Sequence, residues 1–508
     1  MRTALRKTGK FLFLFPFFCL LISGTTCFAD SSLSRSVVRL KIQAAGYNPM
    51  RPWQMEPSES RSGQAVAVGE HELVAVASQI RDHKLIQIQN AIQSELVEAQ
   101  VKVVDYDLDL CLLSVEPKDL SEPFIAVSFK TSVTIGDSIQ FVWLTEDQRF
   151  LKTKGRLEHA DTFFSARSQT GFLQFVASSE SFPGGYTEAI FQGNKIVGLV
   201  QSLDSDKKTS TILPASLIQS FLKKTRETHY LGAPKAGFDF TALSDKITRA
   251  YLKLPPEEKR GIYIQDVFDF GSGSGELKKN DVLLKWGSFD VDSKGAVMLE
   301  GFGKVSLWNL LGEASPGSKV PCVFWRNGTL IESSVTLKNF SSGMLPIPYQ
   351  SSEAAPPYFI VGGYVFQELT LPYLDAFGSN WEAHMNPVLK KLVDKHRFHS
   401  IPEKNRIVLL TQLLPHPINQ GYQQLHQKVV HSVNGTPVKE LKDLQALFSK
   451  SPAEGCFRIV LEEHSPDVLI PAKDLAKADL QIQQLYSVPR LSSSEDEKKA
   501  ITESRKIE

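Results

Sequence analysis

The chain of 508 residues is too long for a single hydrophobic core, and at roughly 150 residues per domain it suggests about three domains. Hydrophobic residues make up 42% and charged residues 22%, which is ordinary for a soluble globular protein. A net charge of +1 gives no electrostatic reason to expect nucleic acid or a membrane surface as a partner, so we expect neither.

The first 29 residues have the features of an export signal. Four basic residues precede the apolar run 11–22, and small residues then lead to Ala29. The alternative is a single membrane anchor, but the run is shorter than the roughly 20 residues that a spanning helix needs. We therefore expect residues 1–29 to be a signal peptide cleaved after Ala29, and the mature protein to be exported to the periplasm or cell envelope, or secreted.

Three cysteines remain after removal of this leader: Cys111, Cys322 and Cys456, one in each expected domain. An odd and dispersed set argues against a disulfide framework. Each cysteine is expected to behave as a small buried hydrophobic residue.

Residues 30–228 contain many short apolar runs separated by turns, and few helical stretches. This pattern predicts an all-β barrel or sandwich, closed by a helix that begins near Pro214. The apolar runs are 37–42, 65–68, 85–88, 101–104, 111–115 and 138–142.

Two further domains follow. Residues 229–340 combine strands with an intervening helix, and an Asn-Gly pair at position 327 between two apolar runs is a good signal for a two-residue hairpin turn. Residues 341–357, rich in Ser, Pro and Ala, are expected to be a linker. The third domain covers 358–490, and the charged tail 491–508 is expected to be disordered.

Three motifs of the first domain lie in a characteristic order. Ser78 follows the apolar run 74–77, Asp109 is followed directly by the run 110–113, and Pro183-Gly184-Gly185 lies in a turn between strands. These motifs and the domains after them resemble the HtrA/Deg (protease Do-like) family over nearly the whole mature chain. The resemblance implies a mainly β fold, namely a chymotrypsin/trypsin-like double β-barrel followed by two PDZ-like α+β domains.

The resemblance places Ser78 at the family's catalytic histidine position and Pro183 at its catalytic serine position, whereas Asp109 matches the aspartate. A triad needs a hydroxyl nucleophile, a base that takes its proton and a carboxylate that orients the base. Proline has no hydroxyl and no backbone N–H for the oxyanion hole, where loss of one donor costs around 3 kcal/mol of transition-state stabilisation. We therefore expect no intact catalytic site, with Asp109 as a vestige.

Substitution by nearby residues is the less favoured alternative. Ser181 lies roughly 6 to 7 Å along an extended chain from Pro183, and His71 and His83 lie outside the turn that contains Ser78. Productive attack requires near-contact geometry. This alternative corresponds to a residual serine endopeptidase with a role in protein quality control.

The second domain offers a candidate peptide-binding loop, Gly237-Phe238-Asp239-Phe240. PDZ domains add an extended peptide to a sheet edge and often hold its C-terminal carboxylate with backbone N–H groups of a glycine-containing loop, which this segment resembles. Because Asp239 would repel a ligand carboxylate, recognition of an internal segment, or of no peptide, stays open.

The third domain resembles the C-terminal PDZ-like domain of the plant-type Deg9-like branch, mainly through the segments 356–366 and 433–441. In that branch the domain is implied to pack against neighbouring protomers more than to bind substrate. His396 and His399 could share a helix face around a metal, but no third ligand accompanies them, so we expect no metal and no cofactor.

The resulting hypothesis is an exported Deg/HtrA-like pseudoprotease that binds unfolded or extended polypeptides through its PDZ-like domains. It acts as a chaperone-like protein, or it assembles with copies of itself or with an active paralogue. The residual endopeptidase is the alternative, because no other site with a convergent acid, base and nucleophile is found.

Overall fold

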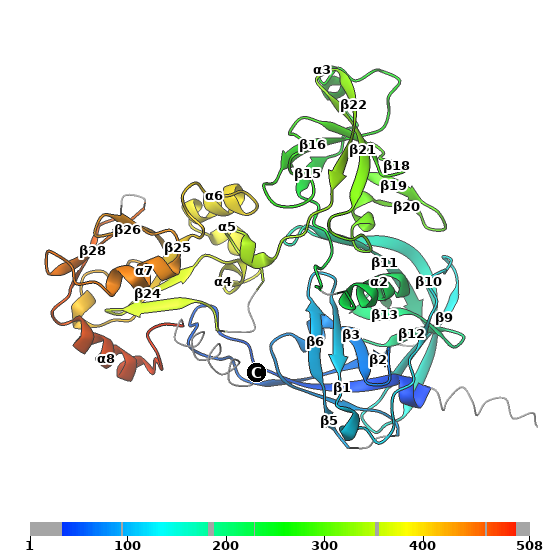
Figure 1. Cartoon of the computed structure of the whole chain (residues 1–508), viewed down its shortest axis with the longest axis horizontal. Coiled ribbons are helices and arrows are strands. Elements are labelled where there is room, and N and C mark those ends of the chain that lie inside the picture. Colours follow the sequence, from blue (N-terminus) through cyan, green and yellow to red (C-terminus); the bar gives the residue numbers. More distant parts are fainter. Residues whose placement is uncertain are drawn as a thin grey trace, which may run out of the picture.

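The computed structural model describes residues 33–92, 95–180, 187–227, 229–350, 355–462 and 465–493. The expected signal peptide 1–29, the turn that contains Pro183 and residues 494–508 of the tail lie outside these ranges. The chain forms two β-barrels, followed by a second unit and a third unit that each have a separate sheet (Figure 1).

The first barrel is a seven-stranded antiparallel sheet. Its strands are β1 Val37–Ala44, β2 Glu59–Ala67, β3 Glu72–Val76, β4 His83–Gln89, β5 Val97–Glu98, β6 Gln100–Asp105 and β7 Leu110–Ser114. They lie in the order β5-β4-β1-β2-β3-β7-β6, and only Ala99 separates the two end strands, so the sheet closes on itself. Inward and outward side chains alternate along β1, where Val38, Leu40 and Ile42 are fully buried.

The second barrel is a seven-stranded sheet followed by a helix. Its elements are β8 Ser128–Phe129, β9 Ser138–Leu144, β10 Phe150–Ser165, β11 Thr170–Ser179, β12 Ala189–Gln192, β13 Lys195–Asp204, β14 Thr209–Pro214 and α2 Ala215–Thr225. The order is β12-β9-β10-β11-β14-β13-β8, and pairing of β12 with β13 closes the barrel. A core shared by both barrels includes Val74, Val142, Leu199 and Phe221 of α2. The predicted double β-barrel is confirmed.

The second unit is a small sheet with one short helix. Its elements are β15 Phe238–Thr241, α3 Lys246–Tyr251, β16 Ile262–Val267, β17 Val282–Trp286, β18 Phe289–Asp290, β19 Ala296–Leu299, β20 Gly303–Ser306, η3 Leu307–Leu310, β21 Lys319–Arg326 and β22 Thr329–Thr336. The main sheet has the order β15-β16-β17-β21-β22. The predicted two-residue hairpin turn joins β21 to β22, because Asn327 and Gly328 both have positive φ, 52° and 89°.

The third unit combines a sheet with helices on its faces. Its elements are β23 Tyr358–Val361, β24 Tyr364–Glu368, α4 Leu371–Asp375, α5 Trp381–His384, α6 Pro387–His396, β25 Val408–Leu413, β26 Lys428–Val433, β27 Thr436–Pro437, α7 Leu441–Phe448, β28 Cys456–Leu461, β29 Val468–Pro471 and α8 Leu475–Tyr486. The order is β23-β24-β25-β26-β28-β29. The α+β character expected for this domain is present.

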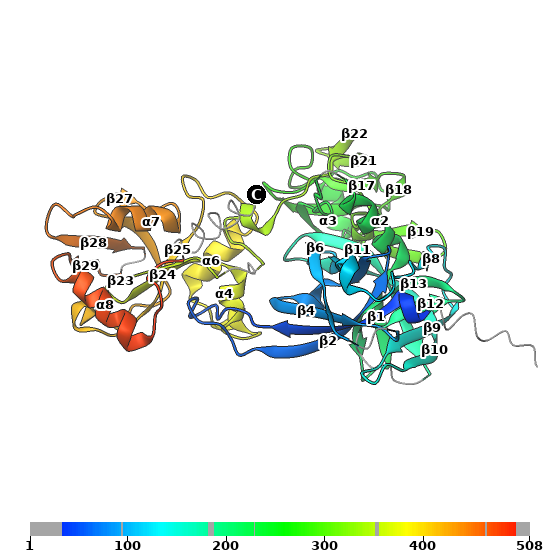
Figure 2. The ribbon, with the colours of Figure 1, turned by 60° about the horizontal axis from the view of Figure 1, so that its bottom comes forward.

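The third unit contacts the first barrel through the loop between β1 and β2, which reaches it in Figure 2. Gln367 donates Nε2 to the Pro49 carbonyl at 2.8 Å, and Gln412 donates Nε2 to the Met50 carbonyl at 2.6 Å. The predicted linker packs against the third unit, since Leu345 is buried in a core with Leu369 and Leu371 of that unit.

The start of the predicted tail is paired with β23. The Ile360 N–H donates to the Leu491 carbonyl at 2.7 Å, and the Tyr358 N–H donates to Ser493 Oγ at 3.1 Å. Of the three cysteines in the described ranges, all free, Cys111 and Cys322 are buried as expected, whereas Cys456 is half-buried. In the described part of the chain, no helix is both long and apolar enough to cross a membrane.

Candidate functional site

Ser78 and Asp109 are brought together at the junction of the barrels. Ser78 lies in the short helix η1 Ala77–Ile80, and Asp109 lies just before β7 with a positive φ of 57°. The Ser78 N–H donates to Asp109 Oδ1 at 2.6 Å and the Ser78 hydroxyl donates to Oδ2 at 3.3 Å. The Ala77 N–H also donates to the Asp109 carbonyl at 3.0 Å. The two positions therefore have the proximity that the family motif implies.

Asp109 has a third partner that the motif does not include. Gln201 on β13 donates Nε2 to Asp109 Oδ2 at 2.9 Å. Burial raises the pKa of Asp109, and the hydrogen bonds from Gln201 and Ser78 oppose that rise. All of these side-chain partners are neutral, so the carboxylate has no base to orient.

The nearby histidines do not take that place. His83 Nδ1 contacts the Ile80 carbonyl at 3.0 Å, and the His71 carbonyl accepts from the Val115 N–H at 3.0 Å. Within the described ranges, no hydrogen bond joins a histidine to Asp109. Ser181 and Pro183 lie outside those ranges, although Thr187 at the end of that segment accepts from the Gln64 N–H at 2.8 Å.

The candidate peptide loop of the second unit is packed against the barrels. Gly237 has a φ of 77°, and a Cβ at this position would lie 2.6 Å from the Gly271 carbonyl carbon. The Ala236 N–H beside it donates to the carbonyl of Gln169, in the turn between β10 and β11, at 2.8 Å. The Gly237 carbonyl accepts from the Phe268 N–H at 2.9 Å. Two backbone groups at this loop are therefore already hydrogen-bonded within the chain, and fewer remain for a peptide ligand.

The surface between β15 and η3 is filled by aromatic rings. Trp308 of η3 lies 4.9 Å from Phe238 and 5.4 Å from Phe240, between ring centroids. Phe164 of β10 stacks on the same tryptophan at 5.0 Å. A Cβ at Gly171 would lie 2.6 Å from the Trp308 carbonyl oxygen, so the hairpin β10–β11 is in close contact with η3. Phe238 and Phe240 thus belong to a core in this arrangement.

Asp239 points instead toward the third unit. It is paired across strands with Asp266, and both line a cavity of about 250 Å³ together with Arg397 and His399. Burial and the charge of Asp266 raise the pKa of Asp239.

His399 joins the second unit to the third unit across this cavity. Its Nε2 lies 3.0 Å from Asp266 Oδ2, and its Nδ1 lies 3.4 Å from Asp269 Oδ1. Burial disfavours the charged ring, but the two carboxylates outweigh burial and raise the pKa of His399. His396 is buried and makes no such contact, and the described residues contain no group of three or more side chains placed to hold a metal.

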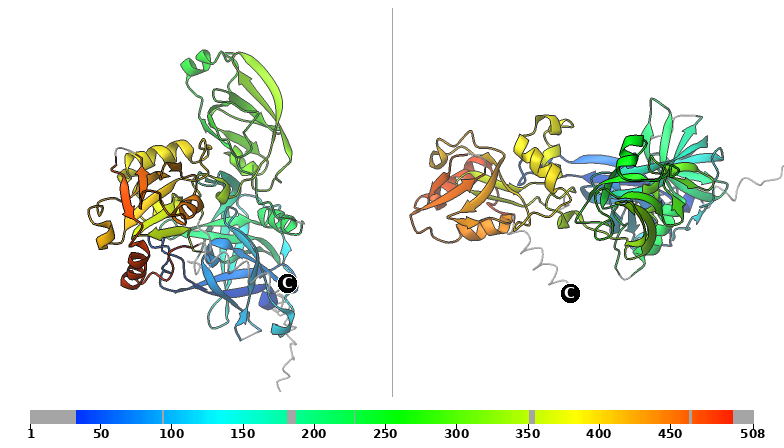
Figure 3. Two further views of the ribbon diagram at one scale, coloured as in Figure 1. Left: turned by 60° about the vertical axis from the view of Figure 1, so that its left-hand side comes forward. Right: turned by 90° about the horizontal axis from the view of Figure 1, so that it is seen from above.

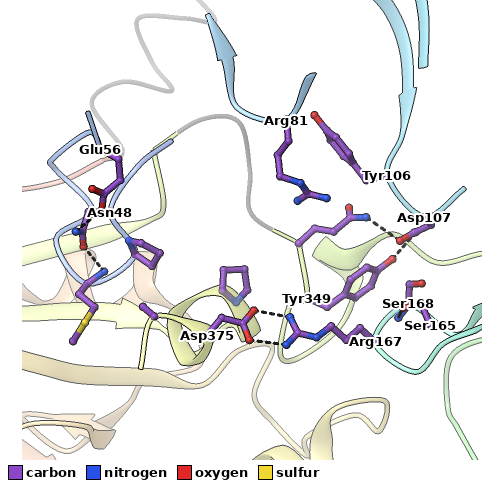
Figure 4. A pocket seen from close by; sticks show the side chains of 15 residues that line it. Asn48, Glu56, Arg81, Tyr106, Asp107, Ser165, Arg167, Ser168, Tyr349 and Asp375 are labelled. Carbon is purple, nitrogen blue, oxygen red and sulfur yellow. Dashed lines mark hydrogen bonds and ion pairs between the residues drawn. The ribbon is translucent and has the colours of Figure 1, made fainter. Parts of the chain in front are cut away.

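A second joint connects all three parts of the chain around Asp107 (Figure 4). Its carboxylate accepts from the Tyr349 hydroxyl at 2.8 Å and from Gln350 Nε2 at 2.9 Å, both drawn in Figure 4. It also accepts from Lys235 Nζ, which the figure does not draw. Close by, Arg167 of the β10–β11 turn makes a bidentate ion pair with Asp375 of α4, at 2.5 and 2.6 Å. A cavity of about 710 Å³ is lined by Asp107, Tyr349, Gln350, Arg167 and Asp375.

Three sets of contacts were not predicted from the sequence: those of His399, those around Asp107, and that of Gln201 with Asp109. Gln201 lies 92 positions from Asp109, and the paired residues of the joints come from separate domains. No motif or spacing marks them. A charged residue within an otherwise apolar stretch, as at Lys235, was the one available signal.

Comparisons with known proteins agree with this organisation. A family model described as a PDZ domain matches residues 347–495. The chain is similar to several protease Do-like proteins of Arabidopsis thaliana. It is 22% identical to mitochondrial protease Do-like 4 over 457 residues, covering 89% of this chain and 84% of that protein. It is 23% identical to chloroplastic protease Do-like 2 over 425 residues, covering 82% and 68%.

Solved structures of HtrA-type proteases also match. The alignment with one of them, the HtrA-type protease AlgW with a decapeptide, covers 61% of the present chain and 97% of the AlgW chain, with 16% identity and a TM-score of 0.46.

Proposed function

Because the chain belongs to the HtrA/Deg (protease Do-like) family yet carries Ser78 and Pro183 at that family's catalytic histidine and serine positions, we propose that it binds polypeptides without cleaving them. The observation that carries this proposal is the environment of Asp109. Its carboxylate oxygens are shared by Ser78 and Gln201, which cannot act as a general base at neutral pH.

Each of the two substitutions alone would largely abolish catalysis. Removal of the nucleophile or the base of a serine protease lowers the turnover rate by about 10⁶-fold. Pro183 additionally lacks the N–H that an oxyanion hole takes from the nucleophile residue, a loss of around 3 kcal/mol. Two such changes together leave no route to ordinary acyl transfer.

We favour chaperone-like holding of unfolded chains as the form of binding. The second unit exposes two apolar side chains one helical turn apart on α3, Ile247 at 81% and Tyr251 at 83%. The first PDZ-like loop is engaged with the barrel turn at Gln169, so an exposed apolar surface is better placed to meet a client than that loop. Mixed assembly with an active relative is the second form of the same proposal.

Residual endopeptidase activity is the competing function, and one experiment separates the two. The purified mature chain is incubated with unfolded casein, and separately with a heat-unfolded model client whose aggregation is followed by light scattering. We expect intact casein and suppressed aggregation. The variant Ile247→Ser/Tyr251→Ser should suppress aggregation less, with Leu485→Ser on α8 as an exposed control.

Casein cleavage that disappears in Ser181→Ala would refute the proposal and would establish the endopeptidase. Intact casein without any suppression of aggregation would refute the holding role and leave assembly as the form to test.

Export of the protein is part of the same proposal. Its support is the basic and apolar character of residues 1–29. Mass spectrometry of the protein from the producing cell should give Asp30 as the first residue, and an intact Met1 would contradict export with cleavage.

A further inference from the structure

Strand β22 of the second unit is a long, regular edge strand. It spans eight residues, pairs with β21 along its whole length, and is the last strand of the sheet. Figure 3 (left) shows this yellow-green strand pair at the outer margin of the upper unit. An edge of this kind presents a row of backbone groups that are ready to pair with another strand.

The register shows which backbone groups face outward. Arg326 and Thr329 flank the two-residue turn and form a hydrogen-bonded pair, and such pairs alternate with non-hydrogen-bonded pairs along an antiparallel ladder. The N–H and C=O groups of the residues at even positions therefore point away from β21. Across the described ranges, these groups make no hydrogen bond to the protein. The residues are Leu330, Glu332, Ser334 and Thr336.

Several other sheet edges in the described ranges are covered. Both barrels are closed, β23 is paired with residues 491–493, and the chain at the start of β15 is bonded to the Gln169 turn. Natural edge strands are usually protected by proline, lysine, a bulge or a short length. β22 has none of these features, and its one charged residue is Glu332.

The surface beside this edge is partly apolar. The side chains of Leu330 and Glu332 lie on the same sheet face as Trp325 and Val323, their partners on β21. These four residues line a shallow cavity of about 580 Å³, and Leu330 is 51% exposed. A strand added to this edge would cover that apolar surface.

We propose that β22 pairs antiparallel with β22 of a second copy of this chain, about a twofold axis at Ser333. In this register each outward residue meets an outward residue, Leu330 opposite Thr336 and Glu332 opposite Ser334 of the second copy. The four pairs exchange about eight backbone hydrogen bonds. A register centred on Glu332 would place two like charges directly opposite, which is unfavourable. The interface is self-complementary, as a twofold dimer requires.

This inference goes beyond the proposed function, because strand pairing through the second unit does not depend on whether the barrels cleave or hold polypeptides. Its failure would leave the casein and aggregation results unchanged, so the two proposals fail separately.

Light scattering coupled to size exclusion of the full mature chain tests the pairing. Ser334→Pro removes an outward N–H without touching the β21 ladder and should halve the particle mass, whatever assembly the barrels form. Ser334→Glu opposes Glu332 of the second copy twice per dimer and should weaken association about tenfold. Glu332→Lys/Ser334→Glu restores opposite charges and should restore the mass.

Circular dichroism and thermal unfolding of each variant should match the parent protein and exclude misfolding. A parent mass that equals one chain, or a mass unchanged by Ser334→Pro, would overturn the proposal. Failure of the double variant to recover association lost in Ser334→Glu would overturn this register.

Discussion

Replacement of Lys235 by methionine should weaken the connection between the barrels and the second unit. The Lys235 side chain is only 2% exposed, and its Nζ donates to Asp107 and to Thr170 Oγ1. Methionine keeps most of the volume but removes the charge. Asp107, 16% exposed, would then keep only the Tyr349 hydroxyl and the Gln350 amide as side-chain donors.

Breaking a buried ion pair by removing one partner costs about 3 to 5 kcal/mol. Because Asp107 keeps two neutral donors and some contact with water, we expect a value near the lower limit, about 3 kcal/mol. Lys235→Met/Asp107→Asn also removes the orphaned charge and should cost only about 1 kcal/mol, since paired removal of buried charges is often close to neutral. The two substitutions should therefore be strongly non-additive.

Urea unfolding followed by tryptophan fluorescence measures both effects, because Trp286 and Trp308 lie in the core of the second unit. The four proteins of the cycle are compared at one pH and one concentration. A loss below about 1 kcal/mol for Lys235→Met, or a double variant as unstable as the sum of the single variants, would refute the reasoning.

Three further predictions follow from single contacts. Gly171→Ala places a methyl group 2.6 Å from the Trp308 carbonyl oxygen and should lower the free energy of unfolding in urea by about 1 to 3 kcal/mol. Gly343→Ala is the control and should change that free energy little, because the nearest atom, Ser341 Oγ, lies 4.0 Å away. Equal effects of the two variants would contradict the close packing at Gly171. The pKa of His399 is raised in the folded protein, so the stability it contributes is complete below about pH 6.5 and is lost as pH rises through the higher folded pKa. The free energy of unfolding of His399→Gln should lack this pH dependence. A pH dependence equal to that of the parent protein would contradict the role of the His399 ion pairs. Iodoacetamide should label Cys456 first in the native protein, because burial raises the pKa of Cys322 to about 11 and raises the pKa of Cys111 further. Mass spectrometry that shows Cys111 labelled first would contradict this order.

The sequence was sufficient for the fold because local and global signals agree. A double barrel and PDZ-like units require particular local structures, and the sequence specifies each of them. Examples are the short alternating strands, the Asn-Gly turn before β22 and the apolar run after Asp109. Ser78 and Asp109 could be placed together for the same reason, since the family motif carries their spatial relationship.

The environment of those residues could not be predicted in the same way. Gln201 reaches Asp109 only because the two barrels pack against each other and bring β13 of the second barrel close to the start of β7 of the first. Phe238 and Phe240 resemble part of a ligand loop, but the length of the hairpin β10–β11 brings Phe164 and Gly171 onto Trp308. Such contacts depend on how whole units dock, and no periodicity in the sequence records them.

The predicted linker illustrates the same limit on a smaller scale. Its composition of Ser, Pro and Ala indicates an irregular connection. The described residues of 341–357 are indeed mostly irregular in backbone structure. Leu345 and Ile347 are nevertheless fully buried in a core with Phe398 of the third unit. Two isolated apolar residues give no periodic signal, although they position Tyr349 against Asp107.

The central claim is that this chain has no activated serine, and covalent labelling tests it most directly. The purified protein is treated with a fluorophosphonate probe and its intact mass is measured, with an active serine protease labelled in parallel as a positive control. The environment of Asp109 and the proline at position 183 predict an unmodified mass. An adduct that is lost in Ser181→Ala or Ser78→Ala would contradict the account.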